Sequence, residues 1–202
     1  LNTMSHWNLL LITRDNMFTE SDVKEYTNGQ TKFVIDKVIN RDDVKTILNI
    51  GYRHDSDLTI ENKCKSLGKT FSVLEVFSGN CEELRSRNYD VIEMDVRDIK
   101  NLDETYDAVI WLHGPEHVTW EQFLDIRKDI ESKANKIVMY QAPIGHCPQG
   151  SEYGNEYEIH LSTLNSEMFK ELGYNVLNNL HAENPEYALP SEWTFSAWIE
   201  KE

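Results

Sequence analysis

The stretch Thr46-Ile-Leu-Asn-Ile-Gly51-Tyr-Arg-His-Asp-Ser56 joins five residues of strand-forming composition to a glycine and a polar segment. A short apolar run bounded by turn residues is typical of a parallel strand that is buried on both faces. A glycine at its end allows the chain to turn sharply and a ligand to approach the backbone. Because open parallel sheets bind ligands at the carboxyl ends of their strands, we expect a binding site directly after Ile50.

Strand-like and helix-like segments alternate along the rest of the chain. Further strands are predicted at 70–77, 89–94, 107–112, 136–141, 174–178 and 193–199, and helices at 20–28, 31–40 and 163–172. Such alternation predicts an α/β fold with a parallel sheet and helices on both faces. The last two strands lack a connection with helical periodicity, so we expect the final strand to be antiparallel to its neighbour.

Capping patterns mark the ends of several predicted helices. Asn80-x-x-Glu83 predicts a capping box that opens one helix, and Thr119-x-x-Gln122 predicts a second, with Val118 and Phe123 placed as a hydrophobic staple. Gly173 is expected to end the 163–172 helix in a left-handed conformation.

Composition excludes several classes of protein. The 202 residues carry a net charge of −15, which disfavours binding to nucleic-acid phosphates and to anionic membranes. No apolar run approaches the roughly 20 residues that span a bilayer. The three cysteines, Cys64, Cys81 and Cys147, form no C-x-x-C pattern, so we expect reduced thiols in the cytoplasm and no metal site.

Two acidic residues follow consecutive predicted strands. Glu75 lies 24 residues after Gly51 and could accept hydrogen bonds from the ribose hydroxyls of a nucleoside-like ligand. Asp95 ends the next strand, where it could contact an adenine edge. The alternative is that both are ordinary solvated loop acids.

With these features, three segments carry a family resemblance: Asp107-Ala-Val-Ile-Trp-Leu-His-Gly-Pro-Glu-His-Val118, Pro143-Ile-Gly145 and Gly154-Asn-Glu-Tyr-Glu-Ile-His160. The chain resembles class I S-adenosylmethionine (SAM)-dependent methyltransferases. The resemblance implies a Rossmann-like, doubly wound, seven-stranded sheet whose last strand is antiparallel. The resemblance covers about residues 30–200. We expect residues 46–202 to form the methyltransferase-like domain and residues 1–45 to form an arm and helices that cover the site.

The resemblance further implies positions for the SAM cofactor. Gly51 would face its methionine part, Glu75 with Val76 its ribose, and Asp95 with Val96 its adenine. Trp111 and His113, at the end of the fourth strand, would border the site of methyl transfer.

The first loop departs from the family's acidic residue and Gly-x-Gly-x-Gly pattern, because those positions hold Asn49, Gly51, Arg53 and Asp55. Arg53 and Asp55 could pair with the carboxylate and ammonium of the cofactor. They could equally block it, which leaves a catalytically inactive binding or assembly protein as an alternative. A nicotinamide enzyme is a third hypothesis, although it calls for G-x-G-x-x-G and only Gly51 is present.

Methyl transfer to a hydroxyl near neutral pH requires a base. His113, His117 and His160 are the candidates, with Glu116 as an orienting partner and His160 as the expected substrate-side group. The expected acceptor is a small molecule, for example a sugar, and the sequence does not indicate an oligomeric state. His113-Gly-Pro-Glu-His117 also matches the zinc-protease pattern H-x-x-E-H, but Gly114 and Pro115 predict a loop, so we attribute the match to chance.

Overall fold

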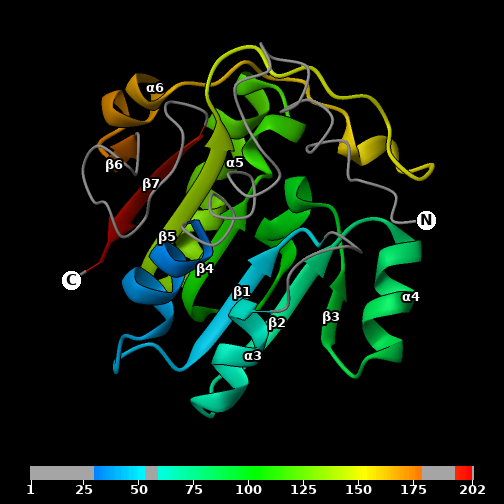
Figure 1. Cartoon of the computed structure of the whole chain (residues 1–202), viewed down its shortest axis with the longest axis vertical. Coiled ribbons are helices and arrows are strands. Elements are labelled where there is room, and N and C mark those ends of the chain that lie inside the picture. The colour runs from blue at the N-terminus through cyan, green and yellow to red at the C-terminus, as the bar shows by residue number, and fades with distance from the viewer. Residues whose placement is uncertain (1–29, 53–58, 179–193, 202) are drawn as a thin grey trace, which may run out of the picture.

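The computed structural model describes residues 30–52, 59–178 and 194–201. Its seven-stranded sheet has the order β3-β2-β1-β4-β5-β7-β6 and runs through the centre of the molecule (Figure 1). Five neighbouring strands are parallel: β1 (Thr46–Ile50), β2 (Thr70–Glu75), β3 (Asp90–Glu93), β4 (Tyr106–Leu112) and β5 (Ala134–Pro143). The last strand, β7 (Thr194–Glu200), is antiparallel to both β5 and β6 (Asn175–Asn178). The predicted fold class is therefore confirmed.

Successive side chains of a strand point to opposite faces of the sheet, and in the central strands successive side chains are apolar. Both faces of the sheet are therefore covered by helices. Leu48 and Ile50 of β1 belong to one core, which includes residues of η2 (Val96–Asn101), α5 (Trp120–Ser132) and α6 (Ser166–Glu171). Ile47 belongs to a second core, under the helix of residues 30–39 and under α3 (Thr59–Ser66). The last turns of residues 30–39 form a π-helix, η1 (Ile35–Ile39). α4 (Ser78–Ser86) packs against β2 and β3.

The α5 helix begins as the sequence predicts. The Thr119 hydroxyl accepts the Gln122 backbone N–H at 3.2 Å, and the Gln122 side chain accepts the Thr119 N–H at 2.9 Å. The helix buries Phe123, Ile126 and Ile130 against the sheet. Thus the capping box fixes where this helix starts, and its apolar spacing fixes which face is buried.

Several predicted boundaries are wrong; for example, the strand predicted at 136–141 is β5, Ala134–Pro143. α4 begins at Ser78, and the Asn80 side chain donates to the Tyr52 carbonyl oxygen at 2.8 Å instead of capping the helix. The second strand ends at Glu75 and not at residue 77. α6 begins at Ser166, because Leu164 pairs with Gly145 in a β-bridge and Asn165 supplies the cap. The helix predicted at 20–28 lies outside the described residues.

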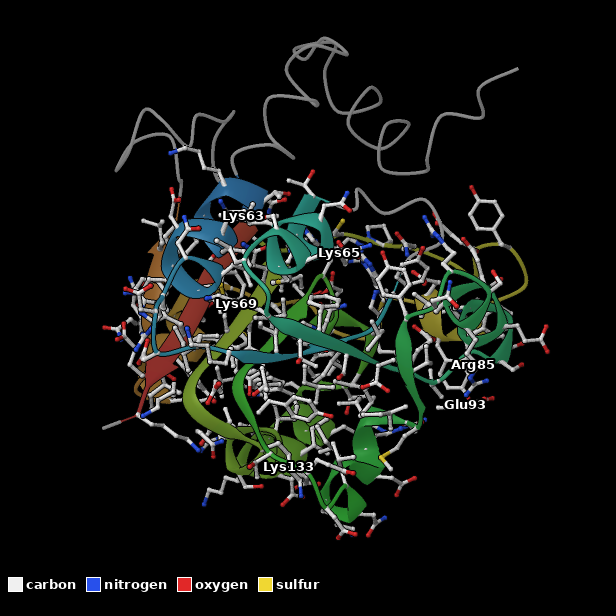
Figure 2. All side chains as sticks on the ribbon, turned by 90° about the horizontal axis from the view of Figure 1, so that it is seen from below. Lys63, Lys65, Lys69, Arg85, Glu93 and Lys133 are labelled. Atoms are coloured by element: carbon white, nitrogen blue, oxygen red, sulfur yellow. The ribbon has the colours of Figure 1, made fainter. Side chains whose placement is uncertain are left out.

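Lysine side chains close the amino-end edge of the sheet. Lys69, just before β2, donates to the carbonyl oxygens of Ile39 and Arg41 at 2.5 and 2.7 Å. Lys133, just before β5, donates to the carbonyl oxygens of Leu102 and Lys100. Figure 2 labels both lysines. These contacts hold the connections at that edge. The loops that build the site leave the opposite edge, at the carboxyl ends of the strands. Among the described residues, no helix is both long and apolar enough to cross a membrane.

Candidate functional site

The end of β1 leaves open space above its backbone. Gly51 has φ +77°, and a Cβ placed there would meet no atom of the described residues within 4 Å. Its N–H donates to the Leu74 carbonyl oxygen at 2.8 Å, and the Asn49 side chain donates to the Gly51 carbonyl oxygen at 2.6 Å. Glycine is suited to this conformation, which directs the chain away from the sheet. Arg53 and Asp55 lie outside the described residues.

Glu75 is the last residue of β2, and it is 4% exposed. One carboxylate oxygen accepts the Tyr52 N–H at 2.8 Å, and the other accepts the Phe77 N–H at 2.7 Å. Burial raises the pKa of Glu75, while the hydrogen bonds to its carboxylate oppose that rise. The side chain therefore ties the segment after β1 to the segment after β2, where Val76 lies.

Asp95 follows β3 and begins η2 by accepting the Arg97 backbone N–H at 2.9 Å. The Arg97 guanidinium binds both carboxylate oxygens of Asp95, and this pairing lowers the Asp95 pKa. Val96 is the first residue of η2 and packs against the core. Asp95 thus makes a bidentate ion pair with Arg97. It lies directly after β3, at the end of the strand, as the sequence predicts.

Trp111 is a core residue at the end of β4, with 4% of its surface exposed. Its ring stacks on Phe123 at a centroid distance of 6.5 Å and meets Tyr140 edge-on at 6.4 Å. The indole nitrogen lies where a side chain on Gly114 would begin, 1.7 Å from an ideal Cβ. The Trp111 ring therefore packs against the loop after β4 at Gly114.

That loop brings the four predicted catalytic residues together. His113 follows β4 with φ +50°, and Glu116 and His117 lie on the short 3-10 turn η3 (Pro115–His117). His160 comes from the β5–α6 connection. The Glu116 carbonyl oxygen accepts the N–H groups of Leu161 and Ser162 at 2.7 and 3.1 Å, and this contact holds the two segments side by side.

The Glu116 side chain is the centre of the cluster and is fully buried. Its Oε1 lies 3.8 Å from His113 Nδ1 and 4.0 Å from His160 Nε2. Burial raises the pKa of Glu116 to about 8. Burial, helped by the nearby His160, lowers the pKa of His117 to about 4. A carboxyl that resists ionisation therefore lies beside an imidazole that resists protonation.

Each histidine ring has one nitrogen beside an oxygen that can only accept a hydrogen bond. His160 Nδ1 lies 2.5 Å from the Cys147 carbonyl oxygen, and His117 Nδ1 lies 3.4 Å from that of Ile159. His113 Nε2 lies 3.2 Å from Gln30 Oε1. The Cys147 oxygen places the His160 proton on Nδ1, and the Gln30 oxygen places the His113 proton on Nε2. His117 hydrogen-bonds the backbone of His113 and Glu158 as well as that of Ile159.

Sequence reasoning missed Gln30, which is 7% exposed. Its amide nitrogen donates to the Thr194 hydroxyl of β7 at 2.7 Å while its oxygen faces His113. A single glutamine in a helical stretch gives no signal of this role, because both partners are remote in the chain.

Comparison with known proteins decides the fold. No family model matches the sequence, and no curated protein does. A SAM-dependent methyltransferase from Archaeoglobus fulgidus superposes with a TM-score of 0.58 at 14% identity, covering 91% of this chain and 100% of its own. The methyltransferase domain of bacterial CtHen1 gives 0.61 at 15% identity, over 87% and 100%. The chain has the class I methyltransferase fold.

A third structure with this methyltransferase fold is magnesium protoporphyrin IX methyltransferase from Synechocystis, which holds bound SAM. Its TM-score is 0.58 at 11% identity, over 97% of this chain and 89% of its own. Within the shared fold, the strand ends of this chain form two groups of residues. One surrounds Gly51, Glu75 and Asp95, and the other surrounds Glu116.

Proposed function

We propose that the protein is a SAM-dependent methyltransferase that acts on a hydroxyl group of a small molecule. The observation that carries this proposal is the position of Glu75, at the end of β2 and tied to the segment that leaves β1 at Gly51. In a fold whose ligands bind at the carboxyl ends of the strands, that carboxylate is suited to the ribose. The SAM bound to the Synechocystis neighbour supports this choice of cofactor.

The remaining cofactor contacts follow the strand order. Asp95 and Val96, after β3, would meet the adenine, and Asn49 and Gly51, after β1, would face the methionine part. Each Glu75 oxygen accepts one backbone N–H, and the Val76 backbone and the Asn80 side chain also hydrogen-bond the carboxylate. A ribose hydroxyl would therefore share or replace some of these contacts.

The reaction needs alignment and one proton acceptor. Bound SAM would supply an electrophilic methyl group, and the residues of this chain would align the acceptor hydroxyl with it and take up the hydroxyl proton. We assign the base to His113, whose side chain is 31% exposed, rather than to His160, whose side chain is 3% exposed. Because His113 Nδ1 is buried beside Glu116, His113 would act through Nε2, in the tautomer with its proton on Nδ1 and with the acceptor hydroxyl replacing Gln30 at Nε2. Glu116, 3.8 Å from His113 Nδ1, would stabilise the imidazolium that results.

The test is calorimetric titration with S-adenosylhomocysteine. We expect micromolar affinity, about −8 kcal/mol, and a loss of about tenfold or more in Glu75→Ala and Glu75→Gln. Glu93→Ala is the matched control, because Glu93 is the register partner of Glu75 on β3 but is exposed and paired with Arg85 at 2.8 Å. Unchanged affinity in both Glu75 variants would refute the ribose assignment.

A second candidate is a catalytically inactive relative that binds or assembles with a partner. The burial of Glu75, whose oxygens both already accept backbone N–H groups, favours it. An absence of binding at millimolar S-adenosylhomocysteine would favour this candidate over the enzyme.

A further inference from the structure

Glu116 is a buried carboxylate that the surrounding protein does not satisfy. Among the described residues, neither of its oxygens accepts a hydrogen bond, and its side chain is 1% exposed. Glu75, the other buried carboxylate near the strand ends, accepts two backbone N–H groups. Burying a carboxylate without such partners is costly, so an unsatisfied one indicates a missing proton or cation.

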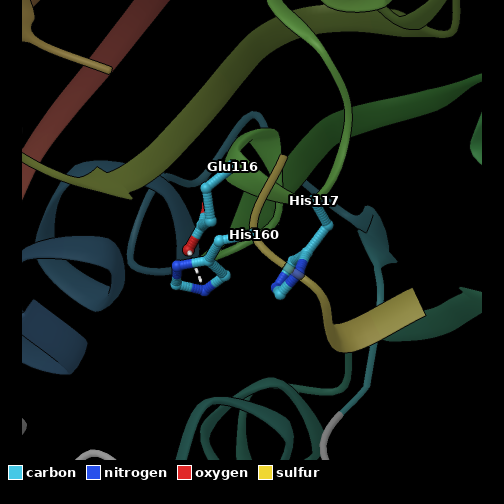
Figure 3. Close-up of side chains that lie close together, drawn as sticks. All are labelled: Glu116, His117 and His160. Carbon is cyan, nitrogen blue, oxygen red and sulfur yellow. Dashed lines mark ion pairs between the residues drawn. The ribbon is translucent and has the colours of Figure 1, made fainter. Parts of the chain in front are cut away.

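Two imidazoles lie beside this carboxylate (Figure 3). One ligand atom each from Glu116, His117 and His160 can be chosen so that all three lie within 4.8 Å of one another. The rings of His117 and His160 meet edge to face at a centroid distance of 4.9 Å. The three side chains therefore converge on one point from two separate segments of the chain.

The backbone holds both rings in an orientation that suits metal binding. The carbonyl oxygen of Cys147 fixes the proton of His160 on Nδ1, so its Nε2 carries the lone pair, and the Ile159 carbonyl oxygen lies 3.4 Å from His117 Nδ1. Metal-binding histidines are commonly oriented in this way by an acceptor on the other ring nitrogen. The position of His160 is fixed further by its own N–H, which donates to the Gln149 carbonyl oxygen at 3.1 Å.

We propose that Glu116, His117 and His160 bind a divalent transition-metal ion, with Zn²⁺ as the preferred ion. Two imidazoles and one carboxylate form a donor set used by catalytic zinc sites, and they leave coordination positions open. Mg²⁺ is disfavoured because it prefers oxygen ligands. Glu116 and His117 belong to the H-x-x-E-H pattern, but His160 from the β5–α6 connection takes the place of His113.

The role of the ion rests on the proposed function. Its open positions would take oxygens of the acceptor, and a bound hydroxyl loses its proton more readily because the ion stabilises the alkoxide. His113 then remains as the base. The acceptor class is therefore a small molecule with two neighbouring oxygens, such as a vicinal diol, which can occupy two open positions.

The experiment starts from full-length protein stripped with a chelator. Titration with ZnCl₂, MnCl₂ and MgCl₂ in the absence of cofactor is followed by calorimetry and thermal shift. We expect one equivalent of Zn²⁺ per chain, a weaker response to Mn²⁺ and none to Mg²⁺. Co²⁺ substitution should give visible d–d absorption without a thiolate charge-transfer band, which distinguishes the proposed ligands from Cys147.

Three variants locate the site. Glu116→Gln and His160→Asn should each lower Zn²⁺ affinity by tenfold or more, while His146→Ala, an exposed histidine in the same connection, should leave it unchanged. In chelator, Glu116→Gln should unfold at the same or a higher temperature than wild type, which shows that the variant folds. Zn²⁺ binding that is absent, or that is equal in wild type, Glu116→Gln and His160→Asn, would overturn the proposal.

S-adenosylhomocysteine titration of the stripped protein separates the two proposals. Cofactor binding without Zn²⁺ binding would overturn the metal site and leave the methyltransferase proposal intact. Zn²⁺ binding without cofactor binding would support the site as a metal site and overturn its role in methyl transfer.

Discussion

Replacement of Gly114 by alanine should destabilise the protein by about 3 kcal/mol, the upper end of the usual range for over-packing. The added Cβ would lie 1.7 Å from Nε1 of Trp111 and 2.1 Å from its Cδ1, so the indole has to move. Trp111 is 4% exposed and stacked on Phe123, so it cannot retreat into solvent. Gly114 has a negative φ of −135°, so the cost does not include that of a left-handed conformation.

Urea unfolding followed by circular dichroism measures this loss, and a fall of roughly 6–12 °C in Tm should accompany it in a chain of this size. Gly150→Ala is the control, because Gly150 is exposed and a Cβ there meets nothing within 4 Å; its expected change is within about 0.5 kcal/mol. In a Trp111→Phe background the indole nitrogen is gone, so Gly114→Ala should cost at least about 1 kcal/mol less. A loss below about 0.5 kcal/mol in the wild-type background, or an equal loss in both backgrounds, would refute the reasoning.

Three further perturbations test other parts of the structure. Thr119→Ala removes the capping box of α5 and should lower the free energy of unfolding by about 1 kcal/mol in urea titration; no change would show that the helix start is held by packing alone. Phe169→Ala, at a fully buried ring that contacts Phe123, Tyr140 and Phe195, should cost about 3–5 kcal/mol in the same assay, and a cost near 1 kcal/mol would contradict this packing. Lys37 and Arg41 lower the pKa of the exposed Glu200, so its ion pairs stabilise the fold above the unfolded pKa and cease to do so as pH falls through the folded value. Glu200→Gln should therefore cost about 0.5 kcal/mol at pH 7 and nothing near pH 2, and an equal cost at both pH values would exclude the ion pairs as its source.

Much of the fold can be predicted from the sequence because local signals and burial agree. β1 occupies residues 46–50 as predicted, since an apolar run ends there at a glycine that adopts a left-handed conformation. The predicted boundaries of helices and strands are wrong where a side chain forms a hydrogen bond to a residue far away in the sequence. Asn80 is a residue type that often caps helices, but its side-chain amide donates to the Tyr52 carbonyl oxygen, a contact that the sequence does not reveal.

The candidate site was only partly predictable for the same reason. The pattern around Glu116 marks a loop after β4, and its histidines are visible in the sequence. Their convergence depends on the Glu116 carbonyl oxygen, which accepts N–H groups from residues 161 and 162. The burial of Glu116 and the Gln30 contact with His113 arise only once the β5–α6 connection and the 30–39 helix have packed.

The hydrogen bonds of the Glu75 carboxylate also allow ligand binding to be followed in the wild-type chain. It holds the amide hydrogens of Tyr52 and Phe77, which come from different connections but share one acceptor group. Either amide hydrogen exchanges with deuterium only when its hydrogen bond to the Glu75 carboxylate breaks, so the two exchange rates report local opening of the strand ends. A ligand that hydrogen-bonds the same oxygens would change both exchange rates together, so this pair of amides reports cofactor binding by hydrogen–deuterium exchange without a known substrate.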